Sequence, residues 1–300
     1  MPPQPKERRR TEQRNTASKN LDRLSSVEIV RLINREDRKV AAAVGREVRV
    51  IARAVDAIVA AIRSGGRLFY VGAGSSGRIG VLDASECCPT FGVSSNVVQA
   101  LIAGGRRAVT NAVEGAEDST RNAERDLAAK NLRRNDVVVG ITASGTTPYV
   151  VKALEYARNR DATTVALTSN PRMPVAANAD IVIAPDVGPE ILTGSTRLKA
   201  GTSQKMVLNM LSTAAMVRLG HAYQNFMIDA LPTNKKVASR ALRILQGATG
   251  KSVSAAEHAL RQAGDNMRVA LVMLKLDLSA SAARKKLARA KNNLRRALGE

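Results

Sequence analysis

Apolar residues are distributed along the chain in two distinct patterns. Between residues 47 and 64 the apolar residues recur every three or four positions, which predicts a helix that ends at Gly65 and Gly66. Elsewhere the apolar residues form short unbroken runs, which are typical of buried strands. Four such runs occur, at 67–71, 136–141, 164–168 and 180–184. Strands separated by helical segments of ten or more residues predict an α/β fold, a parallel sheet with helices on both faces.

The two ends of the chain differ from this middle part. Residues 1–20 are polar and charged, and this composition predicts a flexible basic arm. The pattern is helical throughout 199–246, and three short helical stretches are expected over 247–300. We therefore expect a catalytic α/β domain over 21–246 and a small helical bundle over 247–300.

The composition is that of a globular protein with a substantial core. With 300 residues and 44% hydrophobic content the chain can bury a large apolar interior, and its apolar runs are too short to cross a bilayer. The N-terminus is charged and lacks the apolar core of a secretory signal. The two cysteines, Cys87 and Cys88, are adjacent and suit a reducing compartment. No membrane association and a cytoplasmic location are the expectations.

The net charge of +21 raises the question of nucleic-acid binding. Much of the excess is terminal: residues 1–23 carry seven basic and three acidic side chains, and residues 281–300 carry seven basic and one acidic. Aromatic residues make up 2% of the chain, so a stacking platform for single strands is lacking. We expect a solvated basic surface and no specific nucleic-acid partner. His221 and His258 lie in no motif and offer too little for a histidine-based metal site.

Two loops have the features of phosphate-binding sites. GAGSSG at 72–77 and TASGTTP at 142–148 each follow a predicted strand and precede a helix, so both lie at carboxyl ends of strands. Glycines allow backbone amides to approach an anion, hydroxyls add donors, and the helix dipole favours negative charge. Either loop alone is equally well explained as a tight turn with capping residues. Two such loops in one chain favour a phosphorylated ligand.

Other nucleotide-binding motifs are excluded. GATGKS at 247–252 resembles the end of a P-loop, but Leu245 stands where that motif requires glycine and a helical segment precedes it. A helix end followed by a newly capped helix explains this stretch better. GAGSSG lacks the third glycine of a dinucleotide fingerprint, and no acidic residue follows at the required place.

The two loops resemble the phosphosugar loops of SIS (sugar isomerase) domains, and four further stretches narrow the resemblance. These are RNTASKNLDRLS, LDASECCPTFG, AVEGAED and GPEILTGSTRLKAGTSQKMVLNMLST. Together they resemble the N-acetylmuramic acid 6-phosphate etherase family from about residue 11 to the C-terminal bundle. The segment 188–205 is a signature which that family shares with the glucokinase regulatory protein.

The resemblance implies a lyase that needs no cofactor or metal. In its substrate a D-lactyl ether sits on C3 of a 6-phosphorylated amino sugar, and ring opening makes the C2 proton acidic. Two carboxylates with separated pKa values can then remove this proton and protonate the leaving oxygen. By resemblance these are Glu86, the proton donor, and Glu117, the acid/base partner; which of them takes the C2 proton stays open. The loop at 72–77 would hold the phosphate, and Glu86 would act further along the same ligand.

The resemblance also implies the ligand contacts and the assembly. Substrate and phosphate are expected to contact Gly74, Ser75, Ser76, Gly77, Ser144, Gly145, Thr146, Thr147, Glu190, Ser195 and Lys199. A homodimer is implied, with the pocket completed near the subunit boundary. Proline commonly stands at position 88 in the family, so Cys88 leaves the backbone after Glu86 less constrained.

Simpler interpretations and two other functions remain. Glu117 could merely favour a helix N-terminus, Asp83 and Ser85 could cap a helix, and Arg78 and Lys199 could be surface charges. A noncatalytic phosphosugar-binding regulator would use the same loops without turnover. A sugar-phosphate isomerase would use a similar acid–base pair, but it leaves the 188–205 signature unexplained.

Overall fold

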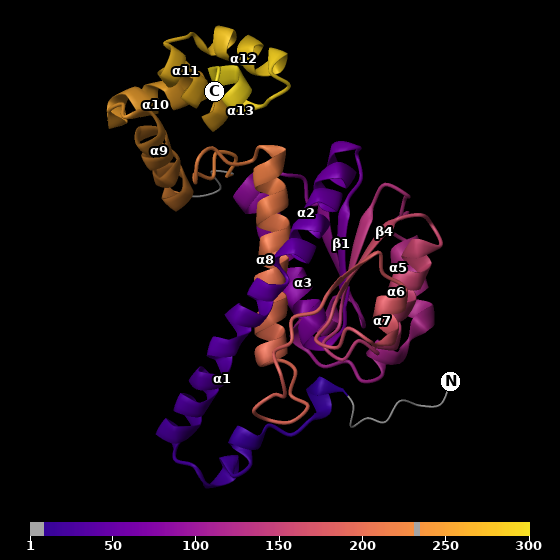
Figure 1. Cartoon of the computed structure of the whole chain (residues 1–300). Coiled ribbons are helices and arrows are strands. Elements are labelled where there is room, and N and C mark those ends of the chain that lie inside the picture. The colour runs from indigo at the N-terminus through magenta and orange to yellow at the C-terminus, as the bar shows by residue number, and fades with distance from the viewer. Residues whose placement is uncertain (1–8, 231–234) are drawn as a thin grey trace. The chain divides into compact units, whose positions relative to one another are not determined.

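The computed structural model describes residues 9–230 and 235–300, and their ribbon is shown in Figure 1. The chain divides into two compact units. Residues 9–85 and Ser95–Ala215 form the α/β unit, and Glu86–Ser94 and Met216–Glu300 form the helical unit. The sequence-based boundary after residue 246 lies later than this division, and a separately folding domain from residue 247 stays a prediction.

The α/β unit is built on a five-stranded parallel sheet in the order β2-β1-β3-β4-β5. All four predicted strands are confirmed. The fifth, β2, was not predicted because it is a partly exposed edge strand whose apolar run is interrupted by Gln99. The strands are β1 (Leu68–Gly72), β2 (Val98–Ile102), β3 (Val137–Ile141), β4 (Thr163–Leu167) and β5 (Ile181–Ile183).

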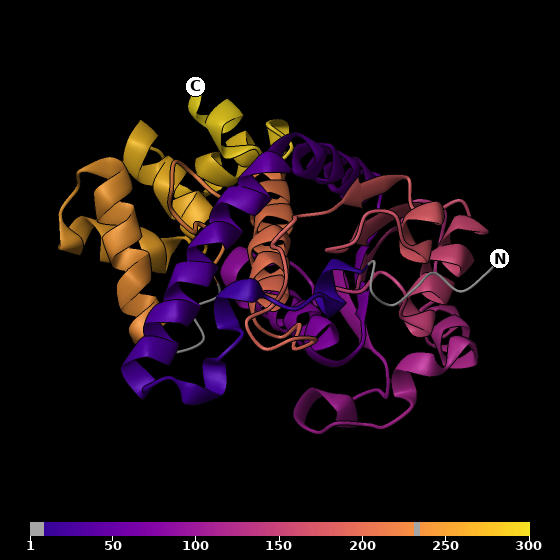
Figure 2. The ribbon, with the colours of Figure 1, turned by 60° about the horizontal axis from the view of Figure 1, so that its bottom comes forward.

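Helices cover both faces of this sheet, as predicted. Phe69 and Val71 of β1 belong to the buried cluster formed with α5 (Thr120–Ala128) and α6 (Pro148–Arg158). Tyr70, between them, points to the opposite face, where its hydroxyl contacts α3 (Gly74–Phe91). The predicted helix at 47–64 is α2 (Val48–Arg63), which lies on the α3 face (Figure 1). Figure 2 shows the sheet between the two helical layers from a second direction.

The strand order fixes where a ligand can bind. Successive strands are added on opposite sides of the β1–β3 pair: β2 lies next to β1 on one side, and β4 and β5 lie beyond β3 on the other. The strand order therefore switches direction between β1 and β3. Gly72 at the end of β1 pairs in register with Ile141 at the end of β3. The loops that follow these two strands are therefore neighbours at the carboxyl edge, the position at which open α/β sheets bind ligands.

The predicted flexible arm is only partly within the described chain. Residues 1–8 lie outside it, whereas residues 9–20, here called the N-terminal strap, form short 3₁₀ turns with specific contacts. Asn15 donates its side-chain amide to Glu36 Oε2 at 2.9 Å and to the carbonyl of Pro189 at 3.1 Å. The strap is thus anchored to the α/β unit before α1 (Ser26–Arg46) begins at a capping box formed by Ser25 and Glu28.

The long helical segment predicted for 199–246 is interrupted. Helix α8 (Lys199–Leu219) ends where Gly220 adopts φ +90°, a left-handed conformation that terminates helices. The segment that follows contains a short bridge between Tyr223 and Phe226 and a cluster in which Asp229 accepts bonds from His221 and Arg268. His221 is therefore a half-buried partner of a carboxylate.

The predicted C-terminal helical bundle is confirmed, although it contains more helices than expected. Each of its last four helices begins at a serine or asparagine whose side chain accepts a backbone N–H of the first turn. GATGKS contains the predicted helix end and new cap, because α9 ends at Thr249 and Ser252 caps α10. The helices are α9 (Lys235–Thr249), α10 (Val253–Gln262), α11 (Met267–Leu276), α12 (Ala280–Arg289) and α13 (Leu294–Leu298).

Candidate active site

The first predicted phosphate loop connects β1 to the start of α3. A side chain on Gly77 would bring its Cβ to 2.6 Å from the Ile102 side chain, and one on Gly72 would come to 2.7 Å from the Gly77 amide nitrogen. These glycines let the first turn of α3 lie directly against the strand end, where the first N–H groups of a helix lack intrahelical acceptors and can bind an anion. The Gly77 N–H itself donates to the carbonyl of Ala73 at 3.1 Å. Ser75 and Ser76 are half-buried there, and within the described chain neither hydroxyl has a hydrogen-bond partner.

The second loop is a cluster of hydroxyl groups between β3 and α6. Thr142 Oγ1 lies 2.8 Å from Thr147 Oγ1, and Thr146 Oγ1 donates to Ser144 Oγ at 3.1 Å. Gly145 has φ +74° and leaves no room for a side chain, whose Cβ would lie 2.6 Å from Met173 Cβ. The hydroxyls are therefore held in place before any ligand binds.

The structure brings the two loops together, as the strand order requires. All the donors that they offer are neutral, namely backbone amides and hydroxyls. Arg78 is the basic residue nearest in sequence to the first loop, and its guanidinium donates to the carbonyls of Val109 and Asn111 at 3.0 and 2.9 Å. Arg9 of the N-terminal strap donates from Nη1 to Thr146 Oγ1 at 3.3 Å. Sequence reasoning missed this residue because it assigned residues 1–20 to a flexible arm.

Glu117 lies on an exposed 3₁₀ turn, Ala116–Asp118, which Gly115 introduces with φ +67°. This turn packs against α6, and Ala116 contacts the same buried cluster as α5 and α6. The turn is thereby fixed to the helix that begins at the second loop, while the Glu117 carboxylate has no hydrogen-bond or ion-pair partner among the described residues.

Glu86 is an exposed residue of α3, ten residues after Ser76 on the same helix. A helix rises about 1.5 Å per residue, so Glu86 lies roughly 15 Å along the axis from the first loop. A phosphate and C3 of a hexose are joined by five bonds, which span less than about 8 Å at 1.5 Å per bond. The action of Glu86 on a ligand held at the start of its own helix stays a prediction.

Asp83, one turn before Glu86, lies inside α3 and is not a helix cap. Its buried carboxylate accepts hydrogen bonds from Tyr70 Oη at 2.9 Å, Asn209 Nδ2 at 2.8 Å and Ser212 Oγ at 3.1 Å. Burial raises the pKa of Asp83, and these bonds offset part of that effect. Asp83 thus ties α3 to β1 and α8 and fixes the orientation of the helix that carries Glu86.

The signature segment contributes Glu190 and Lys199 to a buried polar network, whereas residues 192–194 of the loop between them are exposed. Glu190 accepts the backbone N–H groups of Lys199 and Ala200 at 3.0 and 2.9 Å and so caps the start of α8. Burial raises the pKa of Glu190, and the two N–H groups offset part of that effect. Ser195 lies half-buried in the loop before α8.

Lys199 is not a surface charge, because its side chain is only 2% exposed and pairs with Glu36 of α1 at 2.8 Å. Glu36 also accepts from Lys39 and from Asn15 Nδ2. Burial by itself raises the pKa of Glu36, but the hydrogen bonds from Lys199, Lys39 and Asn15 outweigh it and hold the pKa at about 2. Direct contact of Glu190, Ser195 or Lys199 with substrate stays a prediction.

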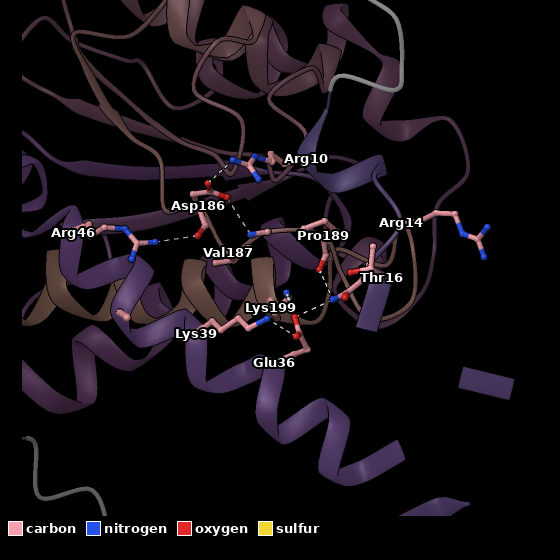
Figure 3. A pocket seen from close by; sticks show the side chains of 13 residues that line it. Arg10, Arg14, Thr16, Glu36, Lys39, Arg46, Asp186, Val187, Pro189 and Lys199 are labelled. Atoms are coloured by element: carbon pink, nitrogen blue, oxygen red, sulfur yellow. Dashed lines mark hydrogen bonds and ion pairs between the residues drawn. The ribbon is translucent and has the colours of Figure 1, made fainter. Parts of the chain in front are cut away.

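A cavity of about 580 Å³ lies beside this ion pair, between the strap, α1 and the segment 186–189 (Figure 3). In Figure 3 Lys39 and Lys199 both point toward Glu36, Arg10 points toward Asp186, and Arg14 points away. Of the predicted ligand residues, Lys199 alone lines the described wall of this cavity. The cavity is therefore distinct from the two phosphate loops.

Within residues 9–230 and 235–300 no group of three or more His, Cys, Asp or Glu side chains is arranged to hold a metal ion. None of the helices there combines the length and apolar character needed to cross a membrane.

Comparison with known proteins agrees with this geometry. The Glucokinase regulatory protein N-terminal SIS domain family matches residues 50–158, and the SIS domain family matches residues 114–214. A protein from Salmonella agona (strain SL483) named N-acetylmuramic acid 6-phosphate etherase is 54% identical over 288 residues, which cover 96% of this chain and 97% of that protein. A protein of the same name from Pectobacterium atrosepticum is 50% identical, with 96% and 95% covered.

A solved structure with a similar fold supports the assignment of the fold. A phosphoheptose isomerase from Francisella tularensis has a TM-score of 0.52 at 18% identity, over 65% of this chain and 100% of that one. At this identity the likeness is one of fold alone. It confirms, with the SIS family match, the predicted SIS-type parallel sheet flanked by helices.

Proposed function

Because this chain belongs to the N-acetylmuramic acid 6-phosphate etherase family, we propose that it is a carbon–oxygen lyase acting on the D-lactyl ether of N-acetylmuramic acid 6-phosphate. The products are N-acetylglucosamine 6-phosphate and D-lactate. The structural observation that carries the proposal is the pair of phosphate loops, both rich in hydroxyl donors, at the switch point of the sheet. Such a site recognises a phosphorylated sugar.

The chemistry follows from the substrate and the two carboxylates. Ring opening gives an aldehyde at C1, which acidifies the proton on C2. A base removes that proton, the bond between C3 and the ether oxygen breaks, and an acid protonates the departing lactate oxygen. Water then adds to C3 of the unsaturated aldehyde, and a proton returns to C2. The sum is substrate plus water giving amino-sugar phosphate plus lactate.

We assign Glu86 as the proton donor to the ether oxygen and Glu117 as its acid/base partner. Both side chains are exposed to an incoming ligand. Glu117 is fixed by its turn against α6, and the helix that carries Glu86 is fixed by Asp83. The phosphate is held by Ser75 and Ser76 and by the second loop, with Gly74, Gly77, Gly145 and the hydroxyls of Ser144, Thr146 and Thr147.

The position of Glu86 supports a homodimer with shared sites. Since Glu86 lies roughly 15 Å beyond its own phosphate loop along α3, it serves a sugar held by the second subunit. Leu82 of α3 and Met210 of α8 are exposed apolar side chains, 52% and 37% accessible, on the two helices that Asp83 joins. A self-complementary interface with a second copy would bury these two side chains.

Subunit complementation tests this arrangement. Glu86→Gln and Glu117→Gln chains, each inactive alone, are expected to recover about one quarter of the wild-type activity when coexpressed, because half of the dimers are mixed and each mixed dimer has one intact site. Expression of each variant by itself is the control. No recovery in a preparation with dimer mass by light scattering would contradict a Glu86 that acts across the dimer.

Loss of single phosphate-loop hydroxyls is expected to affect binding rather than turnover. Ser76→Ala, Ser144→Ala and Thr147→Val each remove one donor to a charged phosphate, worth about 1.5–3 kcal/mol, which corresponds to a KM roughly 10–150-fold higher. The contact persists from bound substrate to transition state, so kcat should stay close to that of the wild type. Steady-state kinetics measure this; a fall in kcat at unchanged KM would place these hydroxyls in the chemical step.

The match to the glucokinase regulatory protein family supports one alternative function, a phosphosugar-binding regulator without turnover. Incubation of the purified full chain with N-acetylmuramic acid 6-phosphate distinguishes the two. We expect stoichiometric D-lactate and N-acetylglucosamine 6-phosphate, and no lactate from the unphosphorylated sugar. Tight binding of the phosphosugar without lactate release would establish the regulator instead.

We place this reaction in the recycling of cell-wall sugars, since its substrate carries the lactyl ether of a muramic acid. A cytoplasmic enzyme fits the phosphorylated substrate and the two cysteines, Cys87 and Cys88, which no disulfide joins in the described chain.

A further inference from the structure

The two phosphate loops lack a cation of their own. A phosphate monoester carries a charge of about −1.5 to −2 at pH 7. The donors of both loops are backbone amides and hydroxyls, and the guanidinium of Arg78 is held on two carbonyls of the segment after β2. Hydrogen bonds from a charged donor are roughly twice as strong as those from a neutral one. A site of neutral donors therefore gains most from one added guanidinium.

The N-terminal strap brings a guanidinium to the second loop. Arg9 is half-buried, and its Nη1 donates to Thr146 Oγ1 at 3.3 Å. Thr146 in turn donates to Ser144 Oγ at 3.1 Å, so the two bonds on Thr146 are compatible with one hydroxyl proton. A guanidinium has five N–H donors, and the bond to Thr146 leaves several of them for an anion at the same loop.

The residue next to Arg9 anchors the strap at this place. The Arg10 backbone N–H donates to Asn170 Oδ1 at 2.9 Å, and Asn170 Nδ2 donates to the carbonyl of Ala143 in the second loop at 2.8 Å. The Arg10 side chain pairs with Asp186 at 3.0 Å, on the side of the cavity (Figure 3). The backbone of the strap is thus tied to the phosphate loop through Asn170, which holds Arg9 within reach of a bound phosphate.

We propose that Arg9 is a ligand of the substrate phosphate and that the strap thereby supplies the charge by which this site selects phosphorylated sugars. This proposal takes the identity of the ligand from the proposed function, and it takes the location of the ligand from the contacts of Arg9 and Arg10. A short guanidinium shift from Thr146 gives bidentate contact with two phosphate oxygens.

Arg9→Gln tests the proposal, with Arg14→Gln as the matched control. Arg14 lies on the same strap and is exposed, so both variants lose one positive charge from one segment. Calorimetric titration of each full-length protein with N-acetylglucosamine 6-phosphate should show about tenfold weaker binding for Arg9→Gln. Arg14→Gln should bind like the wild type, and both variants should melt at the wild-type temperature without ligand.

Kinetics provide the second readout. Arg9→Gln should raise KM for N-acetylmuramic acid 6-phosphate by a similar factor with kcat little changed. Equal affinities of the two variants for N-acetylglucosamine 6-phosphate, or equal losses in both, would overturn the role of Arg9. The binding titration needs no turnover, so a protein that releases no lactate would refute the proposed function while the titration still decides the role of Arg9.

Discussion

Glu86→Gln and Glu117→Gln are each expected to lower kcat by ~10²–10⁴-fold, the usual cost of losing a general acid or base. Glutamine keeps the size and polarity of each side chain, and both residues are exposed, so folding should not change. The two carboxylates transfer protons in the transition state, whereas the phosphate loops supply most of the binding energy for the substrate. KM should therefore stay within a few-fold of the wild-type value.

Exposed neighbours serve as controls for these two variants. Asp118→Asn removes a carboxylate from the same 3₁₀ turn as Glu117, and Ser85→Ala changes the residue before Glu86 on α3. Both should keep near-normal turnover. A Glu86→Gln or Glu117→Gln protein as active as these controls would remove that residue from the mechanism.

Glu36→Gln is expected to lower the free energy of unfolding by about 3–5 kcal/mol, because it leaves the Lys199 ammonium buried without its counter-charge. Both partners of this pair are 2–3% exposed. Lys39→Met breaks the other ion pair of Glu36, but the Lys39 side chain is 59% exposed and its loss should cost less than about 1 kcal/mol. Urea denaturation of the two variants measures the contrast. Equal effects would show that the buried pair contributes no more than the exposed one.

The same ion pair predicts a dependence of stability on pH. The folded-state pKa of Glu36 is about 2, below the 4.5 of an unperturbed glutamate. The carboxylate therefore stabilises the fold in full above about pH 4.5, and this contribution is lost as the pH falls toward 2. The stability difference between wild type and Glu36→Gln should shrink over that range. A difference that does not change with pH would mean that Glu36 is not ionised in the folded protein.

The sheet and the phosphate loops could be predicted from sequence because their signals are local. Apolar runs mark the buried strands, and glycine with serine or threonine directly after a strand marks an anion site at its end. The edge strand β2 was missed because Gln99 interrupts its apolar run and its three central residues are only partly buried. The helix predicted through 199–246 failed at Gly220, where a single left-handed residue ends α8.

The roles of individual charged residues could not be predicted, because they depend on contacts between distant parts of the chain. Arg9 meets Thr146 across 137 positions, and Lys199 meets Glu36 across 163. Composition alone makes residues 9–20 look flexible, and sequence spacing does not show that Lys199 is buried. Helix geometry likewise separates Glu86 from the phosphate loop that precedes it by only ten residues.

Turnover in water labelled with oxygen-18 tests the lyase mechanism most directly. Elimination across C2 and C3 followed by addition of water predicts D-lactate without label and N-acetylglucosamine 6-phosphate labelled at C3. Fragment masses separate that position from the C1 oxygen, which exchanges through the open-chain aldehyde. Label in the lactate would mean that water attacks the lactyl carbon, and it would contradict the elimination assigned to Glu86 and Glu117.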